Sequence, residues 1–304
     1  YAPGTVKNIL SAIRLFLSFM LRNNLQIFPP VVINIAQFYT SVVNRVSAMG
    51  TLQNYQSSIN TFYKMFGYTV DTGDILFKLI NMAAKKQLST VPAQKPPLEI
   101  GHITAMHQII DFTNPAQFAF IAAVGVAFMA TLRRSNVCPP SASMYDPVKH
   151  LSRQDIVINE DGIIVLLKWT KTNQGQQVYK IPVAFSGNSM FDPPSLFINF
   201  AAAHPVKPTD PCFSFYGQCG TLFVMTHVDL AKMLKHFLTL IGVPAAAYTT
   251  HSIRKGGATA IYRSGTSTEL LKQHGTWLSD AYQIYLQHSY SDKLSVSKKV
   301  YAML

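Results

Sequence analysis

Apolar residues recur at intervals of three and four over most of the first ninety residues, the spacing of helices that bury one face. This pattern predicts four helices: one from Thr5, then 31–46, 52–66 and 74–86. Thr5 is a candidate N-terminal cap, Pro29-Pro30 and Gly50 break the pattern, and Asp74 favours the start of the fourth helix. We therefore predict a compact helical domain over residues 1–90.

A polar, proline-rich stretch follows and has no helical pattern. It reads LSTVPAQKPP over residues 88–97. Such a composition is typical of a linker, which we place at residues 91–97, so that the second domain covers 98–304.

The second domain combines helical patterns with one region rich in β-forming residues. Helices are predicted over residues 103–110, 115–131, 194–203, 227–241, 250–263, 267–274, 280–288 and 292–303. Residues 163–169 and 178–183 flank the turn 171–175 and predict a β-hairpin. The expected fold class is mainly α, with a small antiparallel β-sheet in the second domain.

The chain is rich in apolar residues, but its few charged residues are mostly basic. Hydrophobic residues make up 48% of the 304 and charged residues 13%, yet 26 Lys and Arg face 14 Asp and Glu, for a net charge of +12. A positive surface with few compensating acids favours nucleic acid as partner, because phosphate neutralisation supplies much of non-specific affinity. The alternative is a basic globular protein without that partner.

Other features of the composition narrow the class of protein. Cys138, Cys212 and Cys219 are too few for a disulfide framework and lack zinc spacing, which fits a reducing compartment. No apolar run is expected to span a membrane, since the most apolar stretch, 118–131, ends on two arginines. We see no signal peptide, and because the chain begins at Tyr1 rather than Met we expect a piece of a longer protein.

One stretch near the C-terminus carries residue types suited to handling a phosphate. His251 and Arg254 lie three positions apart and so share a helix face, while Trp277 and Tyr285 follow. Arg offers a planar fork of donors, His exchanges protons near neutral pH, and a tyrosine hydroxyl is a possible nucleophile. By itself an H-x-x-R is weak, and Trp277 and the tyrosines would ordinarily be core residues.

Two further segments hold candidate residues. Arg133 and Arg134 follow an apolar helix, where a solvated helix end is the usual explanation. The hairpin offers Lys168 and Lys171, which point to opposite faces if the strand is regular, so only one serves a site. Lys171, at the mouth of the turn, is the better placed, with an ordinary turn lysine as the alternative.

Taken in order, these segments resemble the tyrosine recombinase (phage integrase) family. The matches are L-R-x-S at Leu132 to Ser135, the hairpin Lys171, HSIRKGGAT from His251, and Trp277 eight residues before Tyr285. They span the second domain, and the helical first domain resembles the family's core-binding (SAM-like) DNA-binding domain. HSIRKGGAT and W-x-S-D-A-Y-x-x-Y are most similar to recombinases of eukaryotic mobile elements of the DIRS, Ngaro or crypton kind.

The resemblance implies a site-specific recombinase that cuts and rejoins DNA without metal or cofactor. Tyr285 would be the nucleophile that forms a 3′-phosphotyrosyl link, and the other implied catalytic residues are Arg133, Lys171, His251, Arg254 and Trp277. Implied DNA contacts are Arg133, Lys171, Arg254 and Lys255. A dimer on each site, a tetramer in synapsis and a nuclear location for a eukaryotic element also follow from the resemblance.

Departures from the family pattern leave alternatives open. Asn136 stands where the family often has a carboxylate and is expected to support the surroundings of Arg133 less strongly. The Trp-to-Tyr spacing is one shorter than in many bacterial relatives, so Tyr282 is a second candidate nucleophile. Asp280 is expected to cap a helix, and residues beyond Tyr285 to form an amphipathic tail packed either on a neighbouring protomer or in cis. A domesticated, non-cleaving DNA-binding protein and a type IB-like topoisomerase are the alternative functions.

Overall fold

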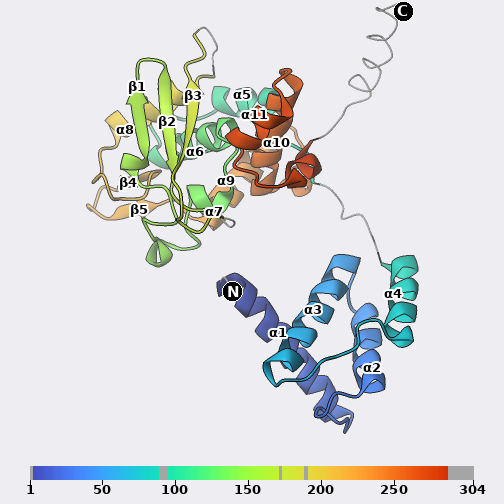
Figure 1. Ribbon diagram of the computed structural model, residues 1–304. Coiled ribbons are helices and arrows are strands. Elements are labelled where there is room, and N and C mark those ends of the chain that lie inside the picture. The colour runs from blue at the N-terminus through green and yellow to red at the C-terminus, as the bar shows by residue number, and fades with distance from the viewer. Residues whose placement is uncertain (1–2, 89–94, 171–172, 188–190, 287–304) are drawn as a thin grey trace, which may run out of the picture. The chain divides into compact units, whose positions relative to one another are not determined.

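The computed structural model describes residues 3–88, 95–170, 173–187 and 191–286 (Figure 1). Contacts divide the chain into two compact units, Tyr1–Gln94 and Lys95–Leu304, each with its own hydrophobic core. The division falls inside the stretch that the sequence marks as a linker.

Four helices make up the first unit: α1 (Pro3–Arg22), α2 (Val32–Val43), α3 (Met49–Met65) and α4 (Ile75–Gln87) (Figure 1). Their apolar faces meet in a core that includes Phe16, Phe38 and Tyr63. The ring centroids of Phe16 and Phe38 lie 5.1 Å apart, edge to face. These four helices form a helical unit with a core of its own.

Helix starts in this unit differ from two of the predictions. Pro3 already lies in α1, so Thr5 is inside the helix rather than its cap, which fits the preference of proline for a first turn. Gly50 does not break the chain, because α3 begins at Met49 and the glycine occupies its first turn. Asp74 caps α4 as expected, and its side chain accepts a hydrogen bond from the backbone N–H of Leu76 at 2.8 Å.

Helix α1 also corrects the expectation that no apolar run reaches membrane-spanning length. By length and composition alone, Gly4–Arg22 could cross a membrane, with a mean hydropathy of 1.3. A core helix passes the same test. Ala12, Phe16 and Met20 of this helix are buried in the first unit's core, and charged Lys7 and Arg14 interrupt its exposed side.

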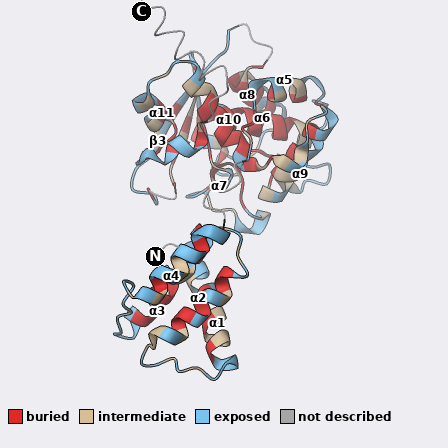
Figure 2. Cartoon of the chain, turned by 90° about the vertical axis from the view of Figure 1, so that its right-hand side faces the viewer, coloured by how far each residue is buried: buried red, intermediate tan, exposed pale blue. Residues whose placement is uncertain are grey.

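The second unit is built around α6 (Pro115–Met129). Every residue from Phe118 to Phe128 is buried, because the helix is apolar on all sides and is packed on all sides. Its neighbours are α5 (Ile100–Gln108), α8 (Pro193–Ala203), α9 (His227–Leu240) and α10 (Thr250–Arg263). Figure 2 shows α6 and much of α10 coloured as buried.

The predicted hairpin is present and belongs to a three-stranded antiparallel sheet in the order β1 (Ile156–Asn159), β2 (Gly162–Leu167), β3 (Tyr179–Ala184) (Figure 1). Ile163 pairs with Val183 and Val165 with Ile181, and these side chains bury one face of the sheet. A second, two-stranded sheet joins β4 (Ser214–Tyr216) to β5 (Leu222–Val224), so the expectation of one sheet is wrong. Three-residue strands are too short to leave a clear alternation in the sequence.

After α10 the chain runs through α11 (Thr268–His274) to a 3₁₀ helix, η4 (Asp280–Tyr285). Ser279, not Asp280, caps η4, and Asp280 pairs with Lys272 at 3.0 Å. The predicted α-helix over 280–288 is therefore a tighter 3₁₀ turn as far as it is described. The predicted C-terminal tail lies outside the described residues.

Two glycines allow α10 to approach its neighbours at backbone distance. A Cβ atom on Gly256 would lie 1.9 Å from the carbonyl oxygen of Leu98, and one on Gly257 would lie 2.0 Å from that of Phe128. A side chain at Gly256 would push α10 away from the segment before α5, and one at Gly257 would push it away from α6. The close approach brings the first two turns of α10, with His251 and Arg254, next to the residues that follow α6.

Candidate active site

Arg133 occupies the junction between two helices. Helix α6 ends in a left-handed turn at Thr131 (φ 48°), and Arg133 is the N-cap of the short helix α7 (Arg134–Val137). Its Nη1 atom is buried and has no hydrogen-bond partner among the described residues. Burial lowers the pKa of Arg133, and the charge of Tyr285 acts in the opposite direction.

Arg254 is held from two sides by backbone carbonyls. It is 2% exposed, Nη2 donates to the carbonyl oxygen of Gly275 at 2.8 Å, and Nη1 donates to that of Thr131. Burial lowers the pKa of Arg254 to about 9, with the charge of Arg133 acting in the same direction, so the guanidinium is still cationic at neutral pH. Its Nε atom has no partner among the described residues.

Trp277 lies against this arginine. The Cζ atom of Arg254 is 4.1 Å from the centre of the Trp277 ring, a cation–π contact. The indole fits only because residue 275 is glycine, since a Cβ there would lie 1.6 Å from a ring carbon of Trp277. Trp277 is 6% exposed, and its indole N–H has no acceptor among the described residues.

The two candidate nucleophiles occupy different surroundings. The Tyr285 ring lies 5.0 Å from His251, 5.6 Å from Trp277 and 5.6 Å from the Arg254 Cζ atom, measured to its centroid. Tyr282 instead lies near Trp277, at 6.3 Å, and beneath the Lys272 ammonium group. The structure therefore brings Tyr285, not Tyr282, to the predicted His and Arg residues.

Thr259 fixes the backbone at that point, because its hydroxyl donates to the carbonyl oxygen of Tyr285 at 2.9 Å. Helix α10 thus carries His251 and Arg254 on its first two turns, and its Thr259 anchors η4.

His251 is kept neutral by its neighbours. Burial of part of the ring lowers the pKa of His251, and the charges of Arg254 and Arg133 lower it further. At neutral pH the imidazole therefore carries a free lone pair that accepts a proton.

A pocket of about 550 Å³ brings Arg133, His251 and Arg254 to one surface. Its other lining residues are Leu132, Arg134, Ser135, His227, Thr249 and Thr250, and none of the nine is acidic. His227 was not indicated by the sequence. It stands at the start of α9 with its Nε2 atom buried and unpartnered within the described residues, and a lone histidine carries no pattern that marks it.

The hairpin residues are only partly described. Lys171 lies outside the described residues. Lys168 pairs with the buried carboxylate of Asp155 at 2.7 Å, so this lysine already has a partner. Asn136 is buried and donates to the carbonyl oxygen of Trp169 at 2.8 Å, which ties α7 to the segment that follows β2 instead of supporting Arg133 directly.

Lys255, which the sequence suggests as a DNA contact, is buried and hydrogen-bonded to the protein backbone. Its residue is 4% exposed, and Nζ donates to the carbonyl oxygen of Lys95 at 2.8 Å. The lysine fastens α10 to the start of the second unit, and this buried position does not offer its ammonium group to a phosphate.

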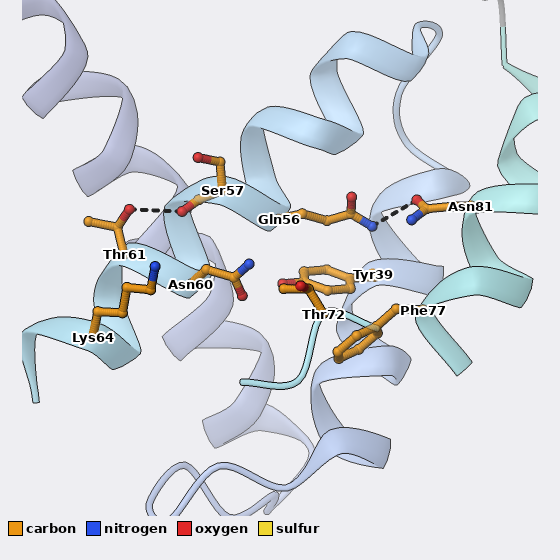
Figure 3. Close-up of a pocket in the computed structure, with 9 residues that line it drawn as sticks. All are labelled: Tyr39, Gln56, Ser57, Asn60, Thr61, Lys64, Thr72, Phe77 and Asn81. Carbon is orange, nitrogen blue, oxygen red and sulfur yellow. Dashed lines mark hydrogen bonds between the residues drawn. The ribbon is translucent and has the colours of Figure 1, made fainter. Parts of the chain in front are cut away.

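A separate cavity of about 390 Å³ lies in the first unit between α2, α3 and α4 (Figure 3). Gln56 donates to Asn81 at 2.9 Å across it, while the Tyr39 hydroxyl and the Asn60 side-chain oxygen lack partners among the described residues. None of the predicted site residues lines it, and its lining holds no carboxylate, histidine or cysteine.

The site in the second unit gathers hydrogen-bond donors. Three buried N–H donors, on Arg133, Arg254 and Trp277, have no acceptor among the described residues, and two of them belong to cations. Buried donors are nearly always satisfied, and a cluster of donors of this kind suits an anionic acceptor. A tyrosine and a neutral histidine lie beside that position.

Comparison with known proteins agrees with this geometry at the level of fold. No protein-family profile and no curated protein sequence matches the chain. Among solved structures it is similar to the Tn1549 transposon integrase in complex with transposon right-end DNA, with TM-score 0.64 and 15% identity over 98% of this chain and 94% of the other. The chain is also similar to a λ integrase dimer bound to a core site, with TM-score 0.59 and 13% identity over 94% of this chain and 89% of the other. A third similar structure is the XerH site-specific recombinase bound to difH, with TM-score 0.58 and 14% identity over 90% of this chain and 72% of the other.

At sequence identities of 13–15%, these similarities concern the fold alone. The similarity covers nine-tenths or more of this chain in each case. The chain has the fold of the tyrosine recombinases, mainly α with small antiparallel sheets.

Proposed function

We propose that this protein cuts and rejoins DNA strands at specific sites through a covalent bond to Tyr285. The observation that carries the proposal is the set of unpartnered, buried donors of Arg133, Arg254 and Trp277 beside that tyrosine. A DNA phosphate supplies the acceptors that these donors lack. DNA is bound in the similar structures of Tn1549 integrase, λ integrase and XerH, which supports double-stranded DNA as the partner.

The proposed reaction is a phosphoryl transfer. The Tyr285 oxygen attacks the scissile phosphorus, the bond to the 5′-oxygen breaks, and a 3′-phosphotyrosyl link forms. His251 accepts the phenolic proton, as its lowered pKa permits, and Lys171 donates a proton to the leaving 5′-oxygen. Arg133 and Arg254 stabilise the charge that builds on the non-bridging oxygens, and Trp277 donates its indole hydrogen bond. Attack by another 5′-hydroxyl reverses these steps and rejoins the strands.

The finer assignment rests on the sequence. HSIRKGGAT and W-x-S-D-A-Y-x-x-Y favour a recombinase that integrates or excises a eukaryotic mobile element, acting in the nucleus. The DNA-bound transposon integrase among the similar structures is consistent with such a role. Assembly as a dimer on each site and a tetramer in synapsis belongs to the same proposal.

A nicked suicide duplex tests the chemistry. Because the released 5′-fragment diffuses away, cleavage should trap a covalent protein–DNA adduct that migrates slowly on a denaturing gel. Tyr285→Phe should abolish the adduct and Tyr282→Phe should retain it, since of these two tyrosines it is Tyr285 that lies beside His251 and Arg254.

The possible results separate the alternatives. An adduct from Tyr285→Phe would show that the nucleophile is another residue. DNA binding without any adduct would favour a non-cleaving DNA-binding protein. Relaxation of supercoiled DNA at any sequence, without recombinant product, would favour a type IB-like topoisomerase.

A further inference from the structure

The two carbonyl oxygens that hold Arg254 both adjoin a threonine in the left-handed region of backbone conformation. Thr131, whose own carbonyl accepts from Nη1, has φ 48°, and Thr276, which follows the acceptor Gly275, has φ 54°. In the described parts of the chain the other non-glycine residues with positive φ are Asn24 and Gln174. A β-branched residue is a true outlier there, because its side chain crowds the backbone.

Both threonines also forgo a hydrogen bond. Thr131 is 0% exposed and Thr276 is 4% exposed, and neither hydroxyl has a partner among the described residues. Glycine or asparagine would adopt the same turn with less strain. Each of the two turns beside Arg254 thus combines backbone strain with a buried hydroxyl that lacks a partner. Strain of this kind clusters at functional sites, which favours a functional role for both turns.

The arrangement suits an arginine that must stay charged and available. The two hydrogen-bond acceptors that hold Arg254 from either side are backbone carbonyls and not carboxylates, so they orient the guanidinium without neutralising it. Stacking on Trp277 at 4.1 Å fixes the plane of the fork. Nε is left without a partner and is free for an anion.

We propose that Thr131 and Thr276 are positioning residues, whose stiff left-handed turns set the two carbonyl oxygens that aim Arg254 at the scissile phosphate. This inference rests on the proposed function. The side chain of Thr131 adds a second constraint, because its methyl carbon lies 3.2 Å from the position of a Cβ on Gly257, against the backbone of α10. A more flexible residue at either position should leave the fold intact and allow the Arg254 guanidinium to take several orientations.

Thr276→Gly and Thr276→Asn separate this role from general packing. The glycine removes the stiffness, whereas asparagine favours the left-handed conformation. With saturating suicide duplex, we expect adduct formation to slow about 10-fold or more in Thr276→Gly and to stay within about 3-fold of wild type in Thr276→Asn. The Kd for DNA should change by less than about 3-fold, and Tm should fall by no more than about 2 °C.

Asn24→Gly is the matched control, since it relaxes a left-handed residue at φ 50° in the first unit and should cleave at the wild-type rate. The proposal is overturned if Thr276→Gly cleaves like wild type, if Thr276→Asn is as slow as Thr276→Gly, or if activity and Tm fall together.

A readout independent of cleavage distinguishes failure of the inference from failure of the proposed function. The Nε–H resonance of Arg254, identified by its loss in Arg254→Lys, should be sharp in the wild type and in Thr276→Asn and broadened in Thr276→Gly. A wild-type protein that forms no adduct would refute the proposed function while this NMR comparison still decides the role of Thr276. Equal line widths in the wild type and both variants would overturn the positioning role whether or not the protein cleaves DNA.

Discussion

At the scale of single residues, the site is defined by charge that the protein leaves uncompensated. The pocket's lining contains Arg133, Arg134 and Arg254 and no acid. Gathering like charges in a partly buried place is unfavourable. Burial lowers the pKa of His251, and the charges of Arg254 and Arg133 lower it further. A bound phosphate would relieve that repulsion, which gives the site a built-in preference for an anion.

This repulsion predicts the pH behaviour of His251. In the free protein the pKa of His251 should lie below the ordinary value of 6.5, because burial and the neighbouring arginines disfavour its charged form. Protonation would remove the base, so single-turnover cleavage should fall as the pH drops through the pKa that His251 has in the DNA complex. NMR titration of the His251 ring gives the pKa directly.

DNA should then shift this equilibrium in the opposite direction. Binding to the Tyr285→Phe protein brings in a phosphate without cleavage, so the pKa of His251 should rise relative to the free protein. A titration midpoint above 6.5 in the free protein would contradict the account, as would a pKa that DNA leaves unchanged.

At the scale of elements, one helix organises the site. Helix α10 presents His251 and Arg254 at its start, and its Thr259 hydroxyl holds the backbone of Tyr285 at 2.9 Å. It reaches α6 closely because residue 257 has no side chain. Asn136 makes a comparable link between α7 and the segment that follows β2.

Gly257→Ala tests this packing. The added methyl group would lie 2.0 Å from the Phe128 carbonyl oxygen, which is rigid backbone, so α10 must move. We expect a loss of unfolding free energy of about 2 kcal/mol or more, measured by urea denaturation, together with reduced cleavage.

Gly101→Ala is the control for that substitution. It lies in α5 with nothing within 4 Å of its added methyl group, so stability should be unchanged or slightly raised. Equal stability of the Gly257→Ala and wild-type proteins would show that the contact between α10 and α6 yields easily.

At the scale of the whole molecule, the net charge of +12 is the dominant electrostatic fact. With 13% charged residues, few acids are available to offset the basic ones. A protein of this kind should bind duplex DNA with a strong dependence on salt, since each neutralised phosphate releases counterions.

Salt titration measures that contact. If the protein neutralises about five phosphates or more, the slope of log K against log salt should be steeper than about −4. Arg133→Ala and Arg254→Ala should each reduce the slope by about 1, because each removes a phosphate contact. A shallow slope for the wild type would refute the broad backbone contact.

Much of this architecture follows from the sequence, because helical periodicity is a local property. Helix α10 begins and ends at Thr250 and Arg263, the predicted bounds, and α6, α8, α9 and α11 lie within two residues of theirs. The hairpin follows from β-forming residues around a turn. The mainly α fold class is confirmed, and the similar structures share it.

Only the tertiary structure decided which of the candidate residues meet. Tyr282 and Tyr285 share a segment and a residue type, yet Tyr285 alone lies against both His251 and Arg254. Lys255, adjacent to Arg254 in sequence, is turned to Lys95, and His227 joins the pocket with no signal of its own. The reason is physical: the sequence determines residue types and local conformation, whereas convergence depends on how closely helices approach. Here the approach of α10 to α6 depends on the missing side chain at Gly257. Arg254 is then held by the carbonyl oxygens of Thr131, 123 positions before it, and of Gly275, 21 positions after it.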